Sequence, residues 1–166
     1  HRNLYTGGSG PAPCPIWKIN LTSPSLVEVG NIPLRLAQTC AFTGIAFNDI
    51  GDLFVGDGAA GRVYILRRNS NQAEIYASGV PGANGLAFDK HGNLWTGDGT
   101  TGLGRVWKIE PGGGTCEDAV NPFQGCKEVF RIQPMANDLD PATTGDISNV
   151  GSDRRTLPPG PISQIV

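Results

Sequence analysis

The sequence predicts an all-β protein, and two observations support this prediction. Residues 43–58 recur as residues 84–99 at an offset of 41 residues, and eight of the sixteen positions are identical. Both copies consist of short apolar runs separated by glycine turns, and 24 of the 166 residues are glycine. A repeat of about 40 residues with this composition is typical of β-propeller blades, which are four-stranded antiparallel sheets.

A second repeat adds a third copy of the unit. Asn3–Gly7 and Ile16–Ile19 match residues 93–97 and 106–109 at an offset of 90 residues, with seven of the nine compared positions identical. The corresponding middle copy lies within residues 52–66. We therefore predict a partial β-propeller of about three antiparallel blades, the first of which begins at its second strand.

Each complete unit is predicted to contain four strands joined by tight turns. Apolar and polar residues alternate in these runs, as they do in half-buried strands. The turns 48–51 and 89–92 carry Asn or Asp first and Gly last, which type I turns favour. The predicted strands are 44–47, 53–55, 62–66 and 73–77 in the middle unit, and 85–88, 94–96, 105–109 and 127–132 in the last.

The predicted domains are propeller blades over residues 1–140 and an extended tail over residues 141–166. The tail is rich in Pro, Gly, Ser, Thr and Asp, a composition typical of extended segments. The sequence from Asn137 onward resembles the beginning of a fourth unit. Closed propellers have about four to eight blades. We therefore expect either a homo-oligomer or a missing propeller segment to complete the ring.

The charge and hydropathy patterns make two classes of partner unexpected. The formal net charge is −2 and no basic run is present, so the positive surface that binds nucleic acid is not expected. No apolar run approaches the roughly 18 residues of a membrane span.

The four cysteines predict two disulfides. We expect Cys116 to pair with Cys126, because the segment between them has the pattern of a loop between two strands, and this leaves Cys14 to pair with Cys40. Disulfides predict a secreted, extracellular or periplasmic protein. The alternative is four buried free thiols in a cytosolic protein. Asn20 begins an Asn-Leu-Thr sequon, which would be glycosylated only in a eukaryotic secretory pathway.

The motif N-G-L-A-F-D-x-x-G-N-L-W-T-G-D, followed by G-R-V-W-K-I, resembles the six-bladed propellers of the SMP-30/gluconolactonase/LRE-like family. It is similar, less specifically, to NHL-repeat and strictosidine-synthase-like propellers. The resemblance covers roughly residues 1–140. It implies a divalent cation, usually calcium, in a central channel, with Asn, Asp and Glu side chains as ligands. The family's Asn before the first strand of a blade matches Asn84 and Asn137, whereas its Glu and its ligand Asp have no clear counterpart here.

Two functional hypotheses follow. The first is an extracellular binding or assembly module that completes its ring, or a larger assembly, through chain–chain contacts, because open blades expose strand edges and sheet faces. The second is a calcium-dependent lactonase or esterase of the SMP-30 type. In that case Asn84, Asn137 and the Asp138 carboxylate would supply oxygen ligands to Ca²⁺, and the metal would polarise an ester carbonyl and activate water. The alternative for these asparagines is that they cap turns.

Overall fold

Every regular element in the described part of the chain is a β-strand. The computed structural model describes residues 3–98, 105–116 and 125–131. These residues form three separate sheets, which confirms the all-β prediction. Among them, no helix is long and apolar enough to cross a membrane. The predicted tail over residues 141–166 lies outside the described residues.

The first sheet contains the first copy of the repeat. Its strands are β1 (Leu4–Gly7), β3 (Cys14–Asn20) and β4 (Ser25–Ile32). The order is β1-β3-β4, and both neighbouring pairs are antiparallel. The prediction that the first copy begins at its second strand agrees with this three-stranded sheet.

The second sheet has the order β12-β8-β7-β6-β5-β2. The predicted four-stranded meander is its centre, although β5 is longer than predicted. The two added strands arrive from other parts of the chain: β2 pairs with β5, and β12 pairs in parallel with β8. The strands are β2 (Ser9–Pro11), β5 (Thr39–Phe47), β6 (Leu53–Asp57), β7 (Arg62–Leu66), β8 (Glu74–Ser78) and β12 (Gly114–Thr115).

The third sheet is a four-stranded antiparallel meander, as predicted. Its order is β13-β11-β10-β9. The strands are β9 (Ala83–Phe88), β10 (Leu94–Asp98), β11 (Arg105–Ile109) and β13 (Cys126–Arg131).

The three sheets repeat the same pairing register. Leu4 pairs with Ile19, Leu53 with Leu66, and Leu94 with Ile109. The pairing of the third and fourth strands of each unit is interrupted by a register shift at one repeat position: between Ile16 and Trp17, between Val63 and Tyr64, and between Val106 and Trp107. The internal repeat is therefore a repeat of structure down to its β-bulges.

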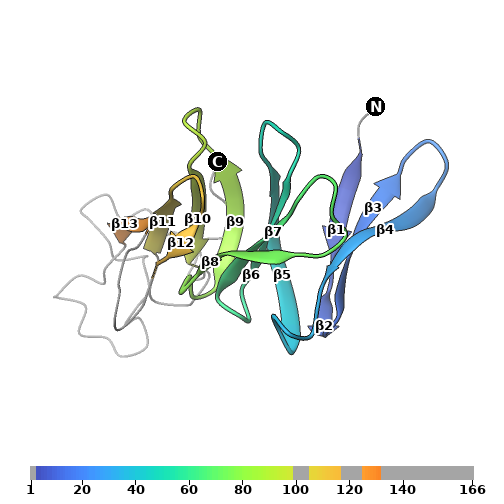
Figure 1. Ribbon diagram of the computed structural model, residues 1–166, viewed down its shortest axis with the longest axis horizontal. Helices are drawn as coiled ribbons and strands as arrows, with labels where there is room; N and C mark the ends of the chain where they lie inside the picture. Colours follow the sequence, from blue (N-terminus) through green and yellow to red (C-terminus); the bar gives the residue numbers. More distant parts are fainter. Residues whose placement is uncertain (1–2, 99–104, 117–124, 132–166) are drawn as a thin grey trace, which may run out of the picture.

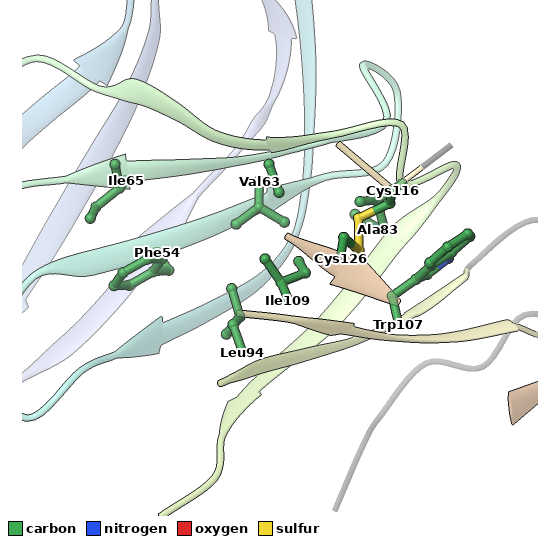
Figure 2. Packing of buried hydrophobic residues seen from close by; sticks show 11 residues of the cluster. Phe54, Val63, Ile65, Ala83, Leu94, Trp107, Ile109, Cys116 and Cys126 are labelled. Atoms are coloured by element: carbon green, nitrogen blue, oxygen red, sulfur yellow. A yellow bond between two sulfur atoms is a disulfide. The ribbon is translucent and has the colours of Figure 1, made fainter. Parts of the chain in front are cut away.

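The sheets follow one another in chain order, with the second between the other two (Figure 1). Phe54, Val63 and Ile65 of the second sheet pack against Leu94 and Ile109 of the third, in a cluster that also contains Trp107 (Figure 2). On its other face the second sheet buries Leu53, Val55 and Leu66 against Ile16 of the first sheet. The second sheet is thus covered on both faces.

The two predicted turns are present and have the same geometry. The Gly51 amide donates to the Asn48 carbonyl at 3.0 Å, and the Gly92 amide donates to the Asp89 carbonyl at 3.0 Å. Gly51 has φ +88° and Gly92 has φ +80°. These backbone angles explain the glycine at the end of both turns, because a Cβ disfavours positive φ.

Both predicted disulfides are present, and each joins neighbouring sheets. The Cys14–Cys40 bridge connects β3 of the first sheet to β5 of the second. The Cys116–Cys126 bridge connects the residue after β12 to the start of β13. All four cysteines are buried. Such bridges are typical of oxidising compartments, so the alternative of four free thiols is wrong.

Candidate functional site: the outer face of the first sheet

One face of the first sheet has no sheet packed against it among the described residues. Leu4 lies opposite Ile19 and Thr6 lies opposite Trp17. Residues opposite each other in an antiparallel pair, and residues two apart along a strand, share a face. We call this set the first outer face, and it consists of Leu4, Thr6, Trp17, Ile19, Leu26 and Glu28.

The same repeat positions are buried in the other two sheets. In the third sheet Leu94, Thr96 and Ile109 are each 0 % exposed and Trp107 is 1 % exposed. In the second sheet the equivalent residues are buried to a similar degree, and they face the first sheet. These second-sheet residues are Leu53, Val55, Tyr64 and Leu66. In both complete units, this face therefore packs on the preceding sheet.

In the first sheet those positions are open. Leu4 is 52 % exposed and Leu26 is 62 % exposed, while Trp17 and Ile19 are half-buried. The side chains are of the kind that fills the core between the other sheets, yet nothing described covers them. A contiguous apolar face of this sort marks an interaction surface.

The first sheet also has an open edge. In the second and third sheets, β6 and β10 are each paired with a preceding strand, β5 and β9. Strand β1 occupies the same repeat position and pairs with β3, and no second strand pairs with it in the described part of the chain. An exposed strand edge presents unpaired amides and carbonyls that can bind another strand.

At the other end of the row, the third sheet has a face against which none of the described sheets packs. Trp95 and Lys108 are cross-strand partners, and Val106 lies opposite Phe130. Phe130 is 57 % exposed, and the other three side chains are half-buried. We call these four residues the third outer face. Lys127, which lies opposite Lys108, adds a second positive charge beside it.

The three tryptophans and Tyr5, which recur at repeat positions, lie in two different environments. Trp107 is in the core, and Tyr5 packs on the cluster between the first and second sheets. The Tyr5 and Phe47 rings are 4.9 Å apart in an edge-to-face contact. Trp17 and Trp95 instead lie on the two outer faces, against which no described sheet packs.

Only one of the three predicted metal ligands can be placed. Asn84 is half-buried in β9, opposite Gly97. Asn137 and Asp138 lie outside the described residues. Among the residues that the structure describes, no group of three or more His, Cys, Asp or Glu side chains is arranged to hold a metal ion. The calcium site and the hydrolase hypothesis therefore stay predictions.

Asn20 is the exposed last residue of β3, at the start of the turn that leads to β4. Its Oδ1 accepts hydrogen bonds from the backbone amides of Thr22 at 3.0 Å and Ser23 at 3.3 Å. The sequon therefore lies on the surface, although the side chain also caps the turn.

A cleft of about 300 Å³ lies beside the turns that join β5 to β6 and β9 to β10. Two of the carboxylates that line it already accept hydrogen bonds from other groups of the fold. Asp52 accepts from the Arg68 amide at 2.9 Å. Asp89 accepts from Trp95 Nε1 at 3.0 Å and from Asn93 Nδ2 at 2.8 Å. We therefore attribute the cleft to the packing of these turns and not to a ligand site.

These hydrogen bonds shift the acidity of both carboxyls. Bonds from the Trp95 indole and then from the Asn93 side chain hold the pKa of Asp89 well below its usual range. Burial favours a higher pKa for Asp52, but donors from Arg68, Asn48 and Arg67 together bring that pKa below its usual value.

We expect Asp89→Asn to reduce the loss of stability in acid. Because the folded pKa of Asp89 is lowered, its ionised form stabilises the fold above the unfolded pKa of about 3.9. That contribution is lost as the pH falls through the folded pKa. The amide of Asn does not titrate, and Asn48 shows that Asn can cap the equivalent turn.

Denaturant midpoints measured from neutral pH to about pH 2 check this expectation. The unmodified chain should lose more stability over that range than the variant. Parallel curves for the two proteins would contradict a role for Asp89 ionisation.

Comparison with known proteins does not assign a family. No protein-family model matches this chain, and no curated protein matches it. The resemblance to SMP-30-like propellers therefore stays a prediction carried by the repeat motif.

The sequence predicted exposed sheet faces but did not identify the residues of the first outer face. Strand β4, which supplies Leu26 and Glu28, was not among the predicted strands. The signal that could have revealed the face was present, because the repeat aligns Leu4 and Trp17 with Leu94 and Trp107.

Proposed function

We propose that this chain is an assembly module of an exported protein, which associates with other copies of itself by binding another antiparallel β-sheet on the first outer face. In this contact the partner sheet would stack on the first sheet as the chain's own sheets stack on one another, in the manner of propeller blades. The observation that carries it is the contrast in exposure between equivalent residues: Leu4 is 52 % exposed, whereas Leu94 is 0 % exposed.

The chemistry of the face supports a sheet as its partner. Each of the two covered equivalents packs on a neighbouring sheet through Leu, Val, Ile and aromatic side chains. Burying apolar surface stabilises by about 25 cal/mol per Å². A second sheet that covers Leu4, Trp17 and Leu26 would therefore provide the main stabilisation of the contact. The open edge of β1 lies on the same sheet and allows strand pairing beside it.

Export is supported by the two disulfides that join the sheets. Bridges of this kind persist outside the reducing cytosol. A secreted, extracellular or periplasmic location is therefore part of the proposal.

The test is the native mass of the chain as a function of concentration, for the unmodified protein and two variants. Leu26→Arg places a charge on the first outer face and should shift the protein to the monomer. Ile50→Arg is the matched control, because Ile50 is 68 % exposed and lies in the turn between β5 and β6. It should leave the mass unchanged.

A chain that stays monomeric at every soluble concentration, with a cooperative unfolding transition, would refute self-assembly through this face. Equal effects of Leu26→Arg and Ile50→Arg would show that any association uses another surface.

A further inference from the structure

We infer that the partner of the first outer face is the third outer face of a second copy of this chain, so that copies associate head to tail. This inference rests on the proposed function and names its partner. It uses only residues of the two sheets at the ends of the row (Figure 1).

The contact between the second and third sheets supplies the template. The second sheet presents Phe54, Val63 and Ile65 toward the third. The third outer face carries Trp95, Val106 and Lys108 at the same repeat positions. Two of these three residues are apolar, and the Lys108 stem is four methylenes long, so it can cover apolar surface while its ammonium reaches solvent.

The first outer face also matches its counterpart in the internal contact, which is the face of the third sheet that packs on the second sheet. The third sheet receives the second through Leu94, Trp107 and Ile109 (Figure 2). The first outer face carries Leu4, Trp17 and Ile19 at those positions, and all three residues are identical in type to their equivalents. A second copy that approaches with its third sheet would thus recreate a contact that the chain already makes internally.

Charge favours the head-to-tail arrangement over a face-to-face one. Glu28 is the acidic residue of the first outer face, and Lys108 with Lys127 makes the third sheet positive. Two first outer faces packed together would bring two Glu28 carboxylates into one interface, where like charges are unfavourable. Packing a first face on a third face brings opposite charges together.

The geometry of the contact is heterologous, because different surfaces of the two copies meet. Such a contact closes into a ring if the rotation between copies allows closure and otherwise extends into a filament. The native mass distinguishes these outcomes, and both agree with the inference.

The decisive experiment is cross-linking between two differently tagged chains, one carrying Ile19→Cys and the other Val106→Cys. The equivalent residues in the contact between the second and third sheets are Ile109 and Val63, which belong to one cluster of buried residues. Both disulfides of the native chain are formed and no cysteine is free, so the added thiol is the only one that a short bismaleimide can modify.

The expected product is a cross-linked dimer that contains both tags, which is lost when Leu26→Arg is added to the Ile19→Cys chain. A product formed by Ile19→Cys chains alone would show face-to-face packing and overturn the inference. An oligomer with no mixed product would overturn the inference and leave the proposed function standing, whereas a monomeric mass would overturn the proposed function itself.

Charge reversal provides a second measurement that introduces no cysteine. Glu28→Lys and Lys108→Glu should each raise the dissociation constant of the assembly by at least about threefold, as expected for exposed ion pairs. The double variant should return toward the value of the unmodified chain. Additive weakening in the double variant would contradict the head-to-tail contact.

Discussion

Leu94→Ala should lower the free energy of unfolding by about 2–5 kcal/mol, the range for deleting a buried leucine side chain. The repeat-equivalent change, Leu4→Ala, should lower it by less than about 1 kcal/mol. Leu94 is 0 % exposed between the second and third sheets, whereas Leu4 is 52 % exposed on the first outer face. The two substitutions remove the same atoms from the same position of the repeat. The difference between their losses of unfolding free energy therefore measures how much packing against the neighbouring sheet contributes to stability.

Denaturant unfolding of both variants checks this result, at a concentration where the native mass is that of one chain. Dilution matters because association through the first outer face would bury Leu4 and increase the cost of removing it. Equal losses in the diluted proteins would contradict the assignment of buried and open faces. A cost for Leu4→Ala that grows with protein concentration would support assembly through this face.

Replacing Cys14 and Cys40 together by alanine should lower the free energy of unfolding by about 3–4 kcal/mol. This bridge closes a loop with a sequence separation of 26 and joins the first sheet to the second. Without it, the unfolded chain gains conformational freedom. The first sheet would then be held to the second by the packing around Ile16, by the pairing of β2 with β5 and by the backbone hydrogen bonds of Asn31 with residues 71 and 73.

The matched control is the double replacement of Cys116 and Cys126, whose sequence separation is 10. The chain-entropy model predicts a smaller loss for this shorter loop, by about 1 kcal/mol. Both variants delete two buried sulfur atoms, so the loss of packing is similar. Chemical denaturation under non-reducing conditions measures the two losses, and a larger loss for the shorter loop would contradict the entropic account.

Much of the fold could be predicted because its signals are local. The turns at 48–51 and 89–92 were predicted from Asn or Asp at the first position and Gly at the last, and the positive φ of Gly51 and Gly92 explains that pattern. Strands β6, β7, β10 and β11 coincide with the predicted strands to within two residues. The disulfide pairing followed from the loop pattern between Cys116 and Cys126.

The elements that were missed depend on distant contacts. Strands β2 and β12 contain three and two residues, and they exist because β5 and β8 offer edges to pair with. The sequence Ser9–Pro11 contains one glycine and one proline and has no strand pattern of its own. The side chain of Asn84 was predicted to bind a metal, but its intended neighbours lie beyond the described residues.

The sequence by itself determined the repeat unit and its turns, because these depend on residues close together along the chain. It also determined that Leu4, Leu53 and Leu94 are equivalent. Only the tertiary structure decided that one of them is open while the other two are buried. Burial depends on whether a neighbouring sheet is present, and an identical side chain at an identical repeat position carries no information about its neighbour.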